Sequence, residues 1–291
     1  MDISKGYVKT SFGKIHYRFC GKGKPVILLH PSPRSSVIFE KLMATLGKDC
    51  EVFALDTLGF GYSDPLPKKF NFYDLAESVY EFVKNLSLDE ITIFGLHTGN
   101  KIASAIGYKN YDCIKNIILC GMSHSLILDK NIRNSQIYKI VNKNSDEDVY
   151  NNRWKKTYEL ISNSWWSKKI LDNKNLQLKD FKVAQHEVVD FINSRESYDL
   201  IYNENYRFDF EKAVKSISVP VLIIELISER EKDIGSQANL FKFFGDHFYI
   251  FQLINSHTGI LSDEGRRTDI LETKIDLLSK KIIEFNKNHK I

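Results

Sequence analysis

Short apolar runs alternate with segments of helical periodicity over the first 122 residues of the chain. Two strand-like runs flank the turn at Phe12-Gly13 and predict an N-terminal hairpin over residues 7–20. Four compact apolar runs have the composition of buried strands in a parallel sheet, and they lie at 25–30, 51–56, 91–94 and 117–120. Apolar residues recur at helical spacing between these runs, at 35–46, 75–86 and 99–108. This alternation predicts β-α-β units, and hence an α/β protein with a mostly parallel sheet covered by helices on both faces.

The strand pattern stops near Met122 and returns only in the last quarter of the chain. Two apolar runs and a final segment of helical periodicity follow, at 220–224, 248–254 and 270–285. The stretch between is rich in Lys, Asn, Tyr and Trp, with helical patches but no strongly apolar strand. We therefore predict one α/β core domain made of residues 1–122 and 216–291, interrupted by a helical insertion over 123–215.

Composition and charge narrow the range of partners. The 41 Lys and Arg residues exceed the 37 Asp and Glu residues by a net charge of only +4, which does not indicate a nucleic-acid-binding surface. No apolar run approaches the roughly 18 residues of a membrane helix, and the start of the chain lacks the features of a signal peptide. The four cysteines show no C-x-x-C pairing. We expect a cytoplasmic protein with reduced thiols that binds neither nucleic acid nor membrane. Its oligomeric state, including a homo-oligomer, is left open.

The segment Gly95-Leu96-His97-Thr98-Gly99 lies between a predicted strand and a predicted helix. Ligands of an open parallel sheet bind beyond the carboxyl ends of its strands, which makes this position one to inspect. Glycine two residues on either side of a central residue is typical of the sharp turn called a nucleophile elbow. Side chains at the flanking positions would collide with the neighbouring strand and helix. Only a register centred on His97 puts glycine at both flanks, so the pattern predicts that His97 projects above the sheet in a strained backbone conformation.

Three further motifs stand in a consistent order around this turn. The strand and loop at 25–36 end in H-P-S-P-R-S-S, residues 56–63 form D-T-L-G-F-G-Y-S, and His257 follows the last predicted strand. With these motifs the chain resembles α/β-hydrolase fold proteins, in particular the branch of haloalkane dehalogenases, epoxide hydrolases, meta-cleavage-product hydrolases and many esterases. That branch usually has H-G-x-P-x-S-S in the first loop, where this chain has Pro31 in place of glycine. The resemblance also implies that the insertion over 123–215 is a helical cap.

The resemblance implies a set of site residues. His257 would be the general base, and Glu229 would be the acid that orients it, although Glu225, Glu231 and Asp233 occupy the same loop. The backbone N–H groups of Ser32 and Thr98 would form the oxyanion hole. In this motif His30 is more often structural than catalytic, and we expect Arg34 at the surface. Candidates for lining a pocket between cap and sheet are His30, Arg34, His124, Trp154, Trp165 and Trp166.

The central elbow residue departs from the family, whose members have Ser, Asp or Cys where this chain has His97. An imidazole nitrogen could attack the substrate and form a short-lived acyl-imidazole, or it could act as general base or acid beside His257. A third alternative is a two-His-one-carboxylate metal site formed by His97 and His257, with or without His30, and a carboxylate. A fourth is a protein that has lost its nucleophile and only binds ligand.

From these alternatives we expect a cofactor-independent enzyme that hydrolyses an ester, lactone or similar acyl bond of a small, partly apolar substrate. A cofactor-free lyase or C–C bond-cleaving enzyme that uses His97 and His257 for proton transfer remains an alternative. So does a non-catalytic ligand-binding member of the fold.

Overall fold

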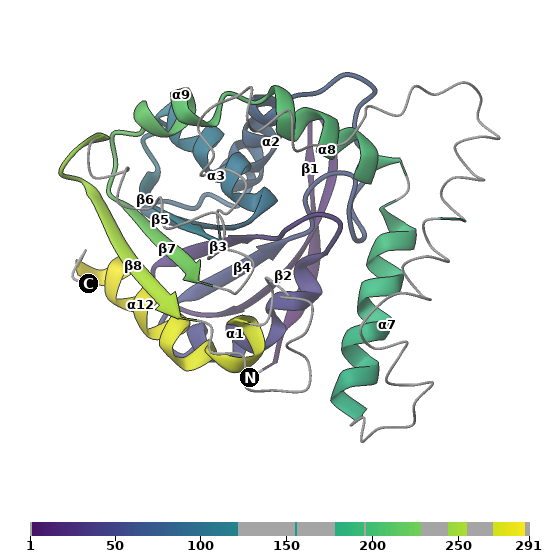
Figure 1. Ribbon diagram of the computed structural model, residues 1–291, viewed down its shortest axis with the longest axis horizontal. Helices are drawn as coiled ribbons and strands as arrows, with labels where there is room; N and C mark the ends of the chain where they lie inside the picture. Colours follow the sequence, from purple (N-terminus) through teal and green to yellow (C-terminus); the bar gives the residue numbers. More distant parts are fainter. Residues whose placement is uncertain are drawn as a thin grey trace.

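Figure 1 shows the computed structural model, which describes residues 2–121, 155, 178–194, 196–227, 244–254 and 270–288. Within these residues the strands form one eight-stranded sheet in the order β1-β2-β4-β3-β5-β6-β7-β8. β1 (Ser4–Thr10) and β2 (Gly13–Gly21) form the antiparallel hairpin, and β2 also runs antiparallel to β4. The remaining neighbours pair in parallel: β3 (Pro25–Leu29), β4 (Glu51–Leu55), β5 (Ile91–Leu96), β6 (Ile114–Cys120), β7 (Val221–Ile227) and β8 (Phe248–Ile254).

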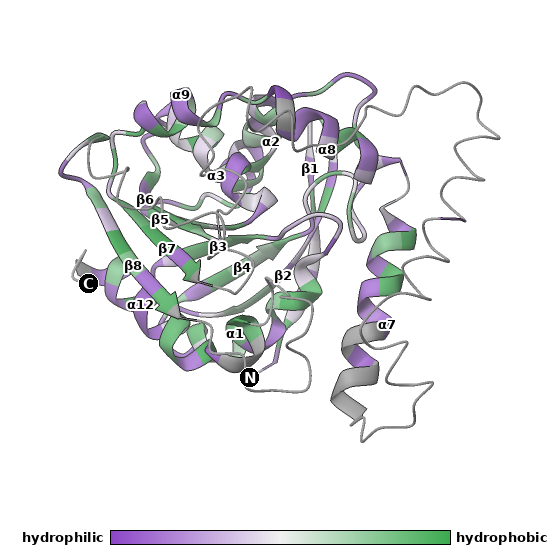
Figure 2. Cartoon of the chain, viewed as in Figure 1, coloured by the Kyte–Doolittle hydropathy of each residue, from purple (hydrophilic) through white to green (hydrophobic). Residues whose placement is uncertain are grey.

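The predicted fold class, an α/β protein with a mostly parallel sheet, is confirmed. Each predicted strand is present, but β6 begins three residues earlier than its apolar run because Ile114 pairs with Ile91 before the polar residues Lys115 and Asn116. Backbone hydrogen bonds define the ends of a strand, so β6 extends through polar residues that an apolar pattern does not include. Figure 2 shows that hydrophobic residues are concentrated in the strands at the middle of the sheet.

Two hydrophobic clusters cover the two faces of the sheet. In β3, Ile27 and Leu29 belong to one cluster, and Val26 and Leu28 belong to the other, because successive side chains of a strand point to opposite faces. The first cluster includes residues of α2 (Phe72–Asn85) and α3 (Thr98–Lys109). The second includes residues of α1 (Glu40–Leu46), α11 (Ile270–Thr273) and α12 (Ile275–Asn288). The sheet therefore has helices on both faces, as the alternating pattern predicts.

The predicted insertion is described only in its C-terminal part, as α7 (Leu178–Asn193), α8 (Ser197–Arg207) and α9 (Phe210–Lys215). Ile201 of α8, Phe208 and the buried residues of α9 belong to the same hydrophobic cluster as α2 and α3. α9 lies next to α3 in the ribbon, whereas α7 lies at the side of the molecule, right in Figure 1. The division of the chain into a core and a cap over 123–215 stays a prediction, and α9 shows that the end of this range shares the core.

Two expectations about the chain as a whole can be compared with the described residues. No helix in the described part is long and apolar enough to cross a bilayer. Cys20, Cys50 and Cys120 are buried, Cys113 is partly exposed, and all four are free thiols.

Candidate active site

His97 occupies the turn between β5 and α3, with φ 50° and ψ −104°. A Cβ added to Gly95 would lie 2.5 Å from the carbonyl oxygen of Gly99, and one added to Gly99 would lie 2.2 Å from that of Leu29. Both flanking positions are therefore restricted to glycine, because the clashing atoms belong to the backbone and cannot move aside as a flexible side chain could. A positive φ at a residue other than glycine costs on the order of 1–3 kcal/mol and persists only where the surrounding structure imposes it. The turn has the geometry of a nucleophile elbow, with histidine at its centre.

The two predicted oxyanion donors lie next to each other beside this turn. The N–H of Ser32, in the loop after β3, donates a hydrogen bond to the Thr98 hydroxyl oxygen at 3.3 Å. The Thr98 N–H is in the first turn of α3, where helix geometry provides no acceptor within the helix. An anionic oxygen bound by both N–H groups would have to take the place of the Thr98 hydroxyl at Ser32. The contact places the Ser32 N–H next to the first residue of α3, and the oxyanion role of the two N–H groups stays a prediction.

His30 is a structural residue of the loop after β3. Its Nε2 accepts a hydrogen bond from the Thr57 N–H at 3.0 Å, and its Nδ1 lies 3.0 Å from the Pro31 carbonyl oxygen. A carbonyl only accepts, so Nδ1 carries the proton and the ring is neutral, and complete burial lowers the pKa of His30. Both nitrogens are occupied by protein groups. In this arrangement His30 is unsuited to the metal-ligand role that the sequence left open for it.

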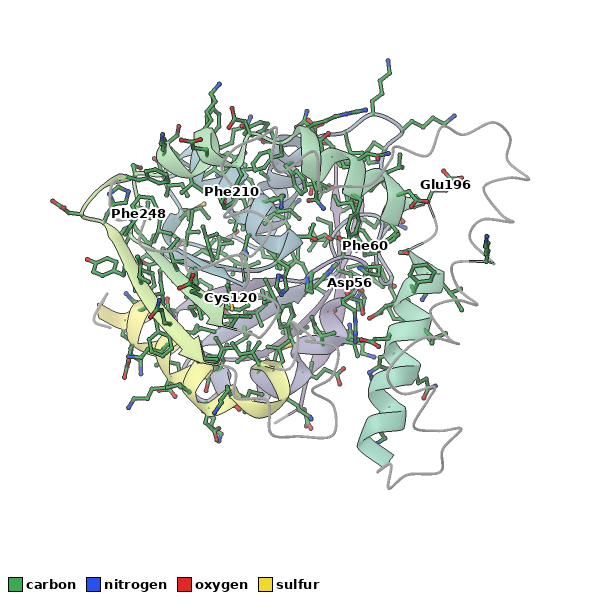
Figure 3. All side chains as sticks on the ribbon, in the orientation of Figure 1. Asp56, Phe60, Cys120, Glu196, Phe210 and Phe248 are labelled. Atoms are coloured by element: carbon green, nitrogen blue, oxygen red, sulfur yellow. The ribbon has the colours of Figure 1, made fainter. Side chains whose placement is uncertain are left out.

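Asp56 organises the loops behind His30. This fully buried carboxylate accepts hydrogen bonds from His16 Nδ1 at 2.8 Å, the Ser36 N–H at 2.6 Å and the Tyr62 N–H at 2.9 Å. Figure 3 labels Asp56 beside Phe60, on the side of the sheet towards α7. A Cβ at Gly61 would lie 2.2 Å from Asp56 Oδ2, which explains the second glycine of the D-T-L-G-F-G-Y-S motif. The motif therefore fixes the loops around the site through a carboxylate that sequence analysis did not single out.

The state of Asp56 predicts an acid-sensitive contribution to stability. Burial alone would raise its pKa, but hydrogen bonds from His16, Ser36 and Tyr62 outweigh burial and lower the pKa from 3.8 to about 2. A carboxyl whose pKa is lower when folded stabilises the protein above its unfolded pKa, by roughly 2 kcal/mol for a shift of this size. We expect this contribution to be lost as the pH falls from about 4 to about 2. Urea unfolding of wild type and Asp56→Asn across this range should show a steeper loss in wild type. Parallel pH curves would contradict the prediction.

Arg34 is not a surface residue, contrary to the expectation from sequence. Its Nη1 lies 2.8 Å from Glu187 and its Nε lies 3.2 Å from Asp190, and both partners belong to α7. Ser35, the next residue, donates its hydroxyl to the other Asp190 oxygen at 2.6 Å. Burial raises the pKa of Asp190, while Arg34 and Ser35 act in the opposite direction. The loop that contains Ser32 is thus joined to a helix of the predicted cap.

Sequence analysis missed these α7 partners, although one signal was available. Asp190 is a charged residue between two apolar pairs, V-V and F-I, in a helix where such a position faces a packed surface. Its side chain is almost fully buried. A buried carboxylate needs a cation or hydrogen-bond donors, and a search for one would have included Arg34.

Several predicted site residues lie outside the described part of the chain: Glu229, Glu231, Asp233, His257, His124, Trp154, Trp165 and Trp166. Their roles stay predictions. Glu225, one of the alternative acids, is described. It is buried within β7 and accepts a hydrogen bond from Gln252 of the neighbouring strand β8 at 2.9 Å. The Glu225 side chain therefore links β7 to β8 through this hydrogen bond.

Comparisons with known proteins agree with this geometry. Residues 24–153 match the family model described as the alpha/beta hydrolase fold. The chain is 29% identical over 114 residues to a soluble epoxide hydrolase of Corynebacterium sp. (strain C12). This match covers 39% of this chain and 40% of that protein. It is 31% identical over 112 residues to haloalkane dehalogenase 2 of Mycobacterium tuberculosis, 38% of this chain and 39% of that protein.

A solved structure extends the likeness to nearly the whole chain. The esterase EaEST from Exiguobacterium antarcticum superposes with a TM-score of 0.69 at 15% sequence identity, over 98% of this chain and all of the esterase. The two curated relatives, in contrast, are matched over less than half of their length. The segment that the family model matches, residues 24–153, includes the elbow and the loops after β3 and β4. Sheet order, elbow geometry and the likeness to the esterase structure show that the chain has the α/β-hydrolase fold, and the family model matches residues 24–153 of it.

Proposed function

We propose that the protein is a cofactor-independent hydrolase that cleaves an ester, lactone or similar acyl bond of a small, partly apolar substrate. The observation that carries the proposal is the elbow at His97, where a strained turn places an imidazole at the end of β5, one residue before Thr98, whose hydroxyl accepts from the Ser32 N–H. An imidazole is a nucleophile and a proton carrier near neutral pH, and paired N–H groups stabilise the oxyanion of acyl transfer. The similarity to an epoxide hydrolase, a haloalkane dehalogenase and an esterase supports a hydrolytic reaction.

In the mechanism that we propose, a neutral imidazole nitrogen of His97 attacks the substrate carbonyl carbon. The carbon–oxygen double bond opens to an oxyanion, which the N–H groups of Ser32 and Thr98 stabilise. His257 accepts the proton from the other ring nitrogen of His97 and passes it to the leaving alcohol as the oxyanion collapses, so a neutral acyl-imidazole remains. A water molecule then gives a proton to His257 and attacks the acyl carbon. As the acid leaves, His257 returns this proton to the His97 ring, which restores both histidines.

His257 and Glu229 enter the proposal through their positions in the sequence. They follow the last residues of β8 and β7 by three and two residues, respectively. β5, which leads into His97, runs parallel to both strands, so all three carboxyl ends lie at the same edge of the sheet. In this role Glu229 would hold the tautomer of His257 and stabilise its cation.

We expect wild-type protein to hydrolyse short-chain p-nitrophenyl esters or small lactones, and His97→Ala and His257→Ala each to lower kcat by roughly 10²-fold or more, since each removes a proton-transfer or nucleophilic group. His247→Ala is the matched control. His247 precedes β8 at the opposite end of the strand, where its Nε2 lies 2.8 Å from the Ile217 carbonyl oxygen. This variant should retain wild-type kcat.

Other outcomes distinguish the mechanisms. Loss of turnover in His257→Ala alone would contradict a nucleophilic His97 and indicate direct attack by water. Rapid acid quench followed by mass spectrometry should detect an acyl group on the His97 peptide of the wild type. Absence of wild-type turnover on every ester and lactone would contradict the proposed hydrolysis. Proton exchange on carbonyl compounds would then test the lyase alternative.

A further inference from the structure

We propose that Gly121 and Asn100 are positioning residues that hold the imidazole of His97 in one orientation. The site is, on this view, built for histidine at the elbow and is not a serine or aspartate site that has lost its nucleophile. The catalytic meaning of this inference rests on the proposed function, whereas the orientation of the ring can be measured without any substrate.

Gly121 provides the surface against which the ring lies. It follows β6 directly, with φ +64°, and its N–H donates to the Ile224 carbonyl oxygen of β7 at 3.0 Å. A Cβ at this position would lie 2.7 Å from His97 Cε1 and 3.0 Å from His97 Nε2. The ring therefore occupies the volume that any side chain at 121 would need.

The contact with position 121 is made by ring atoms that only a long side chain at position 97 would place there. Cε1 and Nε2 are the outermost atoms of the imidazole, whereas serine and cysteine have one heavy atom beyond Cβ and aspartate has a short carboxylate. Shorter side chains at 97 would leave the space above Gly121 unfilled. Glycine at position 121 therefore leaves room for a side chain as long as that of histidine at position 97.

Asn100 fixes this surface relative to the elbow. Its fully buried side chain donates from Nδ2 to the Cys120 carbonyl oxygen at 2.8 Å and accepts from the Cys120 N–H at 3.0 Å. The same carbonyl oxygen accepts a hydrogen bond from the His97 N–H at 3.1 Å. Cys120, labelled in Figure 3, is the last residue of β6, so the strand end that leads to Gly121 is joined both to the backbone of His97 and to α3.

A held imidazole contributes to catalysis through orientation. Reacting groups that are fixed near the attacking geometry avoid part of the entropic cost of the reaction, and displacements of about 1 Å are costly. The elbow fixes the Cα of His97, and the bare backbone of Gly121 lies against the outer edge of its ring. We therefore expect changes at Gly121 to lower kcat more than they raise KM.

The first test is a double-mutant cycle on stability, with Gly121→Ala made in wild type and in His97→Ala. In wild type the added methyl group would contact the His97 ring and, at 2.9 Å, Leu226 Cδ1. Alanine would also be strained at the positive φ of this position. In the His97→Ala background the last two effects remain and the ring contact is absent. We expect Gly121→Ala to lower the urea midpoint more in wild type than in His97→Ala. Equal losses in both backgrounds would overturn the role of Gly121.

The second test is the NMR signal of the His97 imidazole, assigned by its absence in His97→Ala. Gly121→Ala and Asn100→Ala should both shift the His97 Hε1 and ring nitrogen resonances. Asn116→Ala is the matched control. Asn116 is a buried asparagine of β6, and its side chain donates to Thr92 at 3.0 Å, away from the elbow. It should lower stability without moving the His97 signals. Should Asn100→Ala fail to fold, Asn100→Asp removes the Nδ2 donor and keeps the shape of the side chain.

Unchanged His97 resonances in the folded Gly121 and Asn100 variants would overturn the proposal. Shifted resonances in a protein that hydrolyses no ester would leave the positioning role intact and contradict only the proposed reaction. With p-nitrophenyl acetate as probe, we expect Gly121→Ala to lose about tenfold in kcat with a smaller change in KM, and a change in KM alone would count against an orienting role.

Discussion

Gly99→Ala is expected to destabilise the protein by about 3 kcal/mol or more, a large fraction of the roughly 5–15 kcal/mol that is ordinary for a folded protein. The new Cβ would lie 2.2 Å from the carbonyl oxygen of Leu29 and 2.8 Å from its carbonyl carbon. Leu29 is the last residue of β3 and is paired with Leu55 and Gly95, so its backbone cannot move without disturbing two neighbouring strands. Relief would require α3 to move away from the sheet.

Gly107→Ala is the matched control, because it makes the same change in the same helix. Its new Cβ would meet only side-chain atoms, those of Ile117 at 2.6 Å and Ile217 at 2.7 Å, and these can shift. Alanine also has a helix propensity about 1 kcal/mol better than that of glycine. Urea denaturation followed by circular dichroism should therefore show a far smaller loss for Gly107→Ala. Similar losses for both variants would mean that the approach of α3 to β3 is not the cause.

Arg34→Met is expected to cost roughly 3–5 kcal/mol, the range for removing one partner of a buried ion pair. The variant removes the cation 3.2 Å from the Asp190 carboxylate, which is almost fully buried, and the same cation lies 2.8 Å from Glu187. Water cannot replace Arg34 freely because its own side chain is only 11% exposed. Loss of this ion pair should also release α7 from the loop that contains Ser32. Hydrogen exchange of α7 should then be faster in the variant.

A surface ion pair and a double variant test this explanation. Lys24→Met removes the cation of an exposed pair with Glu90 and should cost about 1 kcal/mol or less. Arg34→Met combined with Asp190→Asn should recover part of the stability lost in Arg34→Met, because the second change removes the uncompensated carboxylate. A double variant that is less stable than Arg34→Met would show that the hydrogen bond from Ser35 to Asp190 matters more than the charge.

Local patterns in the sequence predict the sheet and the elbow well, because each depends on residues close together in the chain. The apolar run at 25–29 and the glycines at 95 and 99 impose their structures through immediate neighbours. Partners that come together only in the folded chain are not visible in this way. Asp190 lies 156 residues from Arg34.

The role of Asn100 shows the same limit at shorter range. Its hydrogen bonds to Cys120 join the first turn of α3 to the end of β6, so they depend on the register of two strands in the sheet. From sequence, Asn100 is a polar residue at the start of a helix, where water would satisfy it equally well. For α9, an amphipathic pattern predicts a buried face but does not identify the surface that covers it.

The elbow separates the requirements of folding from those of chemistry. The backbone contacts that shape the turn are made by Gly95 and Gly99, with Leu29, and none of them involves the side chain at position 97. A gene in such a lineage can therefore exchange its reacting atom by single substitutions while the scaffold stays intact. Natural selection can then act on the reaction alone, because the identity of the side chain at position 97 is independent of the backbone contacts that form the turn.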